Sequence, residues 1–120
     1  MFKVVPYIKA NGESFFDDLV EELDAKSKTD KMARIRLKKI VEYVTALEAA
    51  GTYIGFPKVK HLRGKLWELR PTSDRVLFAY AGKEKFVLLH HFVKTTNKTP
   101  ILELEQAERN LKDYLERFGE

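Results

Sequence analysis

Apolar residues recur with a helical period in the first half of the chain. In residues 15–26 they recur about every four positions, and Ser14 stands before them with Asp17 three residues later, as in a capping box. A longer stripe over residues 31–50 follows Asp30 and stops at Gly51. The short connection between the two stripes predicts an antiparallel pair of helices.

The second half of the chain changes to alternating or continuous apolar runs, which are typical of strands. Strands are predicted within residues 2–8, 59–64, 65–71, 75–81 and 85–93. A third helical stripe then runs to the end of the chain, with Thr99 as its predicted cap and Pro100 in its first turn. In the stretch KLWELRP, alternation places Leu66 and Glu68 on one face with Arg70.

This order of elements predicts an α+β domain over residues 1–120. We expect a short strand, two helices, a twisted antiparallel sheet and a C-terminal helix, with the helices packed on one face of the sheet. If the later strands pair as a meander, the ends of neighbouring strands converge on one edge of the sheet.

Composition narrows the class of protein. The chain has 120 residues, of which 44% are hydrophobic and 33% charged, as expected for one globular domain. No apolar run approaches the roughly 20 residues of a membrane span, and the N-terminus lacks the features of a signal peptide. The chain has no cysteine, which excludes disulfides and thiolate chemistry and fits a reducing cytoplasm.

Positive charge is concentrated in one part of the chain. Residues 57–100 hold ten Lys and Arg against three Asp and Glu, whereas residues 1–56 are neutral and residues 101–120 are net acidic. Such a cluster favours a polyanionic partner such as nucleic acid, and the alternative is an ordinary solvated surface.

Several kinds of active site are disfavoured. His90 and His91 are adjacent in a strand, so they point to opposite faces and cannot share a metal ion, and we expect neither metal nor cofactor. None of the serines lies in a nucleophile-elbow motif, and the acidic residues lie mostly on amphipathic helices.

The remaining candidates are cations on strands or strand ends: Arg63, Lys65, Arg70, Arg75, Lys94 and Lys98. Convergent guanidinium and ammonium groups bind phosphodiesters and stabilise charge that builds on phosphorus. Crowding by cations also lowers the pKa of a lysine, which lets it act as a base. Aromatic residues on the same strands (Trp67, Phe78, Tyr80 and Phe92) can stack on bases or form the core.

The ordered set LRG, LWELR, DRVLFAY and FVKTTNKTP resembles the RelE/ParE superfamily of type II toxins, and more closely its HigB-like, phage-derived branch. The resemblance covers nearly the whole chain. It implies a cytoplasmic toxin that cleaves mRNA without metal, usually on the translating ribosome. It also implies neutralisation by a helix-turn-helix antitoxin of the HigA type.

The resemblance also implies roles for individual residues. Arg75 matches the arginine expected at the scissile phosphate, and Arg70 and Lys94 match basic positions at strand ends. Proton transfer then falls to Lys94 or His91. We expect RNA contacts from a further set, of which the resemblance implies Arg63 and the loop that holds Asn97 and Lys98, and the basic charge of the strands adds Lys65. The tyrosine that the RelE branch uses near its C-terminus has no counterpart, since Tyr114 lies on an apolar helical stripe.

Two other functions remain open at this stage. A ParE-like protein poisons DNA gyrase by contact and needs no convergent basic site. A non-catalytic module holds RNA through its cations alone, with strong salt dependence. The long C-terminal helix contributes to an antitoxin interface or simply packs on the sheet.

Overall fold

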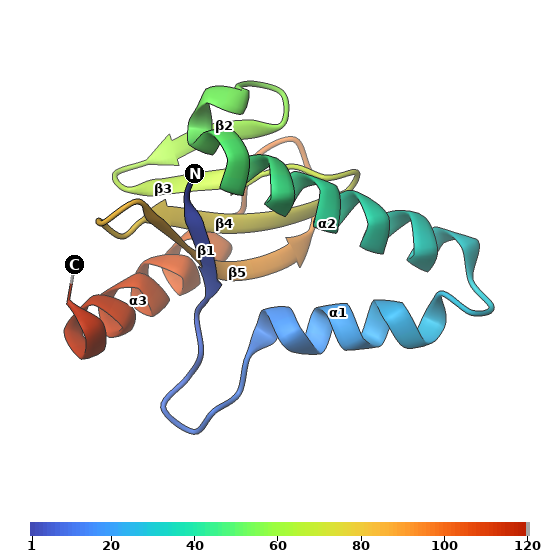
Figure 1. The fold of residues 1–120 in the computed structure, drawn as a ribbon, viewed down its shortest axis with the longest axis horizontal. Helices are drawn as coiled ribbons and strands as arrows, with labels where there is room; N and C mark the ends of the chain where they lie inside the picture. The colour runs from blue at the N-terminus through green and yellow to red at the C-terminus, as the bar shows by residue number, and fades with distance from the viewer. Residues whose placement is uncertain (120) are drawn as a thin grey trace.

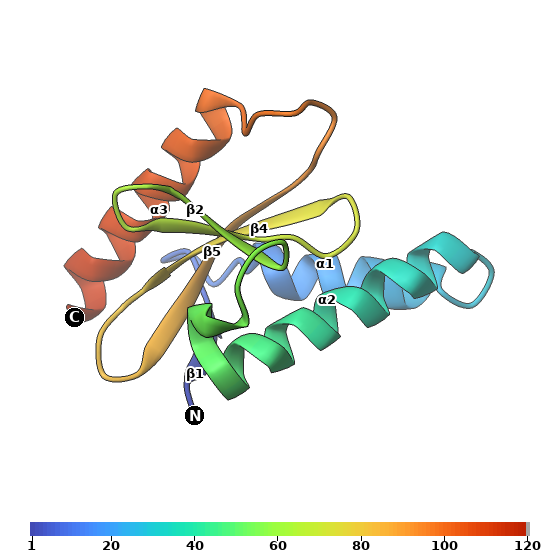
Figure 2. The same cartoon turned by 90° about the horizontal axis from the view of Figure 1, so that it is seen from above.

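The chain folds around a five-stranded mixed sheet in the order β1-β5-β4-β3-β2, with helices on both of its faces (Figures 1 and 2). The computed structural model describes residues 1–119. The strands are β1 (Lys3–Pro6), β2 (Val59–Arg63), β3 (Leu66–Leu69), β4 (Asp74–Tyr80) and β5 (Lys85–Val93). The helices are α1 (Phe15–Lys26), α2 (Lys31–Ala50), the short 3₁₀ helix η1 (Gly51–Ile54) and α3 (Ile101–Phe118).

The first two helices begin and end where the sequence predicts. The Ser14 hydroxyl accepts a hydrogen bond from the Asp17 amide at 3.3 Å, and Asp30 accepts from the amides of Met32 and Ala33 in the first turn of α2. Gly51 ends α2 with φ +60°, and the ring of Phe2 lies 2.8 Å from where a Cβ would stand. Figure 1 shows α1 and α2 side by side as an antiparallel hairpin.

The α+β class and the four-stranded meander β2-β3-β4-β5 are confirmed, but the purely antiparallel sheet is wrong. β1 pairs parallel with β5, with Val4 opposite Phe86 and Val5 opposite Val87. The helical hairpin and three strands intervene between these partners in the chain. Apolar alternation reports which residues face the core and carries no record of strand direction, so the parallel pair was not visible in the sequence.

The expectation that all helices pack on one face is also wrong. α2 covers one face through Leu47, which packs with Val76, Phe78 and Leu88. α3 covers the opposite face (Figure 2). β4 and β5 are unbroken apolar runs. A strand that is apolar on both sides must be covered on both faces of the sheet, which explains why the helices lie on both faces.

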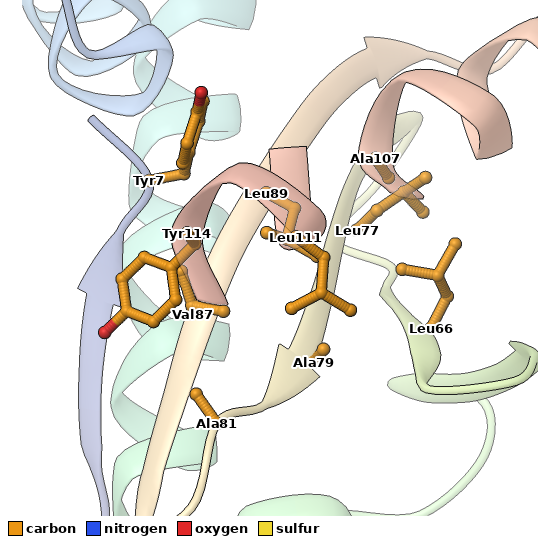
Figure 3. Packing of buried hydrophobic residues seen from close by; sticks show 10 residues of the cluster. All are labelled: Tyr7, Leu66, Leu77, Ala79, Ala81, Val87, Leu89, Ala107, Leu111 and Tyr114. Atoms are coloured by element: carbon orange, nitrogen blue, oxygen red, sulfur yellow. The ribbon is translucent and has the colours of Figure 1, made fainter. Parts of the chain in front are cut away.

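The core beneath α3 fixes that helix on the sheet. Figure 3 shows Ala107, Leu111 and Tyr114 of α3 projecting toward the strands. Their partners on the sheet include Leu66, Leu77, Ala79, Val87 and Leu89. Tyr114 is buried, as its place on the apolar stripe predicts.

The two buried clusters on the faces of the sheet consist of apolar residues, and the buried charged residues Glu68, Asp74 and Arg75 lie toward one end of the sheet. None of the helices within residues 1–119 is both long and apolar enough to cross a bilayer.

Candidate functional site

Three strand ends meet at one end of the sheet and bring the predicted cations together. Arg70 follows β3, Arg75 lies at the start of β4, and Lys94 follows β5. The Lys94 amide donates to the Ser73 carbonyl at 2.8 Å, which ties the end of β5 to the turn before β4. The meander therefore places Arg70, Arg75 and Lys94 as neighbours although 24 residues separate the first from the last.

A buried carboxylate lies beneath these cations. The side chain of Glu68 is on the α3 face of the sheet, and only 3% of the residue is exposed. Its Oε1 atom lies 3.8 Å from the Nε of Arg70 and 3.8 Å from the Nε of Arg75. A carboxylate in this position offsets part of the repulsion between the cations, which allows them to stay close together.

Arg75 is held rigidly. Its guanidinium donates to the Thr72 carbonyl at 2.7 Å and to the Asp74 carbonyl at 2.9 Å, and only 7% of the residue is exposed. Its Nε has no hydrogen-bond partner among residues 1–119. Burial lowers the pKa of Arg75 from its ordinary value, partly offset by Glu68, but an arginine remains charged at any physiological pH.

The pKa of Lys94 is changed by its burial and by the neighbouring cations. Burial lowers the pKa of the Lys94 ammonium, and the charges of Arg75 and Arg70 lower it further. Lys60, which lies opposite Glu68 on β2, adds a smaller effect of the same sign. Lys60 is thus a fourth cation that the sequence analysis missed, although alternation along β2 and β3 could have placed it beside Glu68. We call Arg70, Arg75, Lys94 and Lys60 the cation cluster.

The loop from β5 to α3 is tethered to the same carboxylate. Figure 2 shows this connection looping out beyond the sheet before it returns to α3. The Thr99 hydroxyl donates to Oε2 of Glu68 at 2.9 Å. The prediction that Thr99 caps α3 is therefore wrong, because Pro100 occupies the cap position without a side-chain bond and the Thr99 hydroxyl is used by Glu68. Asn97 and Lys98 lie in this loop and are exposed.

His91 does not join the cation cluster. Its Nε2 lies 2.8 Å from Oδ1 of Asp74, which is fully buried and also accepts two hydrogen bonds from Arg36 of α2. Asp74 and Arg75 are successive residues of β4, so their side chains leave opposite faces of the sheet. His91 therefore lies on the α2 face and the cation cluster on the α3 face, which removes His91 as a group that moves protons there.

The two histidines of the pair have separate structural partners. His90 lies on the α3 face, with Nε2 at 3.1 Å from the Glu103 carboxylate. The predicted separation of His90 and His91 onto opposite faces is confirmed. Within residues 1–119, no group of three or more histidine, aspartate or glutamate side chains is arranged to hold a metal ion.

Arg63 and Lys65 lie at the other end of the sheet. They flank the β2–β3 turn, about 17 Å from Arg70 at the usual rise of an extended strand. Arg63 forms a paired hydrogen bond with Glu108 of α3, at 2.7 and 3.0 Å, and that bond raises its pKa. Arg63 thus fastens α3 to the hairpin, and the structure does not bring it or Lys65 to the cation cluster.

The aromatic residues on the strands that could stack on bases lie in the core or away from the cation cluster. Phe78 is fully buried, Trp67 and Phe92 are partly buried against the core, and exposed Tyr80 ends β4 at the far end of the sheet. The core interpretation is therefore correct for Phe78 and largely so for Trp67 and Phe92.

The chain is similar to two solved structures and to one protein family. A search of curated proteins finds no match. A solved YoeB–YefM complex from Staphylococcus aureus contains a chain with 12% identity and a TM-score of 0.48, aligned over 79% of this chain and 99% of that chain. A heterotetrameric YoeB–YefM toxin–antitoxin complex from the same organism gives 15% identity and a TM-score of 0.45, over 73% of this chain and 91% of that chain.

A family model matches the sequence itself over most of the chain. The matching sequence model, over residues 20–112, defines a class of RelE-type toxins. Its family is described as "Phage derived protein Gp49-like (DUF891)", and the chain belongs to it.

The Asp74 cluster leads to a prediction about stability. Burial alone raises the pKa of Asp74, but hydrogen bonds from His91 and Arg36 outweigh it and hold the pKa at about 2, against 3.8 in the unfolded chain. Stability from this carboxylate is full above pH 4 and is lost as pH falls toward 2. Asp74→Asn should lower the free energy of unfolding by about 2 kcal/mol at pH 7, measured by urea denaturation.

The matched control is Asp24→Asn, at an exposed position on α1, which should change stability by less than about 0.5 kcal/mol. The difference between wild type and Asp74→Asn should shrink as the pH is lowered from 4 toward 2. A difference that stays constant over this range contradicts the assignment.

The Thr99 tether leads to a second prediction. Thr99→Val removes the donor to a buried carboxylate and should lower the free energy of unfolding by about 1–3 kcal/mol, with faster amide hydrogen exchange in residues 94–99. Thr99→Ser keeps the hydroxyl and should exchange like wild type. Equal protection in the valine and serine variants rules out the tether.

Proposed function

We propose that the protein is the toxin of a type II toxin–antitoxin system, of the HigB-like branch, and that it cleaves mRNA on the translating ribosome. The observation that carries the proposal is the convergence of Arg70, Arg75 and Lys94 above one buried carboxylate at an end of the sheet. Family membership supports the toxin class. The implied compartment is the cytoplasm, and the implied antitoxin is a helix-turn-helix protein of the HigA type.

The proposed reaction is transesterification within the RNA strand. The ribose 2′-oxygen attacks the adjacent phosphorus, so the O2′–P bond forms and the P–O5′ bond breaks. The 2′-hydroxyl loses its proton, and the departing 5′-oxygen gains one. The products are a 2′,3′-cyclic phosphate and a 5′-hydroxyl, and the atoms balance without a metal ion or a cofactor.

Arg75 is the residue best suited to stabilise the phosphorane. Two backbone carbonyls fix its guanidinium before substrate arrives, so little reorganisation is needed as charge develops on phosphorus. Its Nε is buried beside Glu68, 3.8 Å from Oε1, and is not available to substrate. Arg70, on the neighbouring strand, adds a second guanidinium for the nonbridging oxygens.

Lys94 is the proposed proton acceptor for the 2′-hydroxyl. A lysine with its ordinary pKa is almost fully protonated at neutral pH and is a poor base. The lowered pKa of Lys94 raises the fraction of neutral amine; burial is the larger cause, and the charges of Arg75 and Arg70 add to it. His91 has no part in the proposed mechanism because it lies across the sheet with Asp74.

Substitution of the cluster tests the proposal. Arg75→Ala and Lys94→Ala should each lower the rate of message cleavage on programmed ribosomes by about 10²–10³-fold, and the double variant should no longer arrest growth. Primer extension on the message measures the cuts. Lys38→Ala, an exposed lysine on α2, is the matched control and should cleave at the wild-type rate.

Lys94→Ala should leave the circular dichroism spectrum and antitoxin binding unchanged. Arg75→Ala removes a cation 3.8 Å from the buried Glu68 carboxylate and should lower the free energy of unfolding, so its cleavage is measured at a temperature where its circular dichroism spectrum and antitoxin binding match those of wild type. Continued cleavage by the double variant overturns the assignment of the site. Growth arrest with uncut transcripts points instead to a gyrase poison, and salt-sensitive RNA binding without cleavage to a non-catalytic module.

A further inference from the structure

An exposed aromatic ring stands beside the cation cluster. Phe56 is 73% exposed, in the segment between η1 and β2. Its backbone is nevertheless well defined, because Phe56 and Pro57 are the central residues of a turn. The amides of Lys58 and Val59 both donate to the Gly55 carbonyl, at 3.0 and 3.2 Å.

The ring is linked directly to a residue of the cluster. The guanidinium carbon of Arg70 lies 5.3 Å from the centre of the Phe56 ring, within the range of a cation–π contact. The Arg70 amide also donates to the Lys58 carbonyl at 2.9 Å, which holds the turn against the end of β3. The ring therefore has a fixed position relative to the guanidinium that the proposed reaction uses.

Packing does not explain this ring. Phe78 and Phe86 show where phenylalanine stabilises the fold, since both are buried in the core. Phe56 leaves most of its surface in water, at a place where the nearby charges are positive. An exposed aromatic face bordered by cations is the combination that binds single-stranded nucleic acid, with phosphates on the cations and bases on the ring.

We propose that Phe56 is a stacking platform for an unpaired base of the RNA, next to the phosphate held by Arg70. The inference rests on the proposed function and deepens it, because it names a residue that would set the preference for the nucleotide beside the cut. Arg70 links the two parts of the site: its guanidinium faces the ring and stands above Glu68.

The test separates base stacking from phosphate binding. The probe is a ten-nucleotide 2′-O-methyl RNA, which cannot be cleaved, prepared intact and with an abasic nucleotide at each position in turn. Phe56→Leu should weaken binding of the intact probe on the order of tenfold, and Phe56→Trp should restore it. One abasic position should weaken wild-type binding by a similar factor and leave Phe56→Leu unaffected.

Phe118→Leu is the matched control. Phe118 is 63% exposed but ends α3, whose length of about 27 Å separates it from the cation cluster. This variant should bind every probe like wild type.

Any of the following binding results overturns the proposal: no binding of the intact probe by wild type, equal binding by wild type and Phe56→Leu, or an equal loss of affinity for intact and abasic probes in Phe56→Leu. A loss of antitoxin binding alone in Phe56→Leu also overturns it and makes the ring part of a protein interface. The probe cannot be cut, so it reports stacking independently of cleavage. If the probes show stacking on Phe56 but the protein does not cleave mRNA, only the nuclease assignment is refuted. Cleavage by wild type with no effect of the abasic probes refutes only the platform.

Discussion

The arrangement of the site depends on one buried carboxylate. Glu68 lies on the α3 face of the sheet with 3% exposure, and it contacts Arg70, Arg75 and the Thr99 hydroxyl. A carboxylate is stable in such a place only when cations or donors compensate for its lost hydration. The compensation comes from three separate parts of the chain: β3, β4 and the loop before α3. The same groups that stabilise the carboxylate are the ones that we propose bind the phosphate.

The first two residues of β4 have different roles on opposite faces of the sheet. Asp74 turns toward α2, where Arg36 and His91 fix it, while Arg75 turns toward α3 and the cation cluster. The contacts of Asp74 on one face also position Arg75 on the other face, because the two residues are adjacent in the backbone of β4. We infer that the ion pair with Arg36 matters for the site although it lies on the opposite side of the sheet from it.

Much of the fold could be predicted because local signals agree with it: Ser14, Asp30 and Gly51 bound the first two helices, and alternation places Glu68 beside Leu66. The errors have physical causes. The direction of β1 depends on a partner 82 residues away, which periodicity does not encode. Thr99 has the right type and place for a cap, but a long-range acceptor takes its hydroxyl. Arg63, Lys65 and His91 are typical phosphate-binding or proton-transfer residues by type, yet the sheet places them away from the cluster.

The chemistry of the cut ends tests the central claim most directly. Purified wild-type protein is mixed with message-programmed ribosomes, and the termini of the fragments are analysed. The account predicts a 2′,3′-cyclic phosphate on the upstream fragment, a 5′-hydroxyl on the downstream fragment, and no cleavage when the nucleotide at the cut carries 2′-deoxyribose. Fragments with a 5′-phosphate, or cleavage that persists at the 2′-deoxy position, would contradict it.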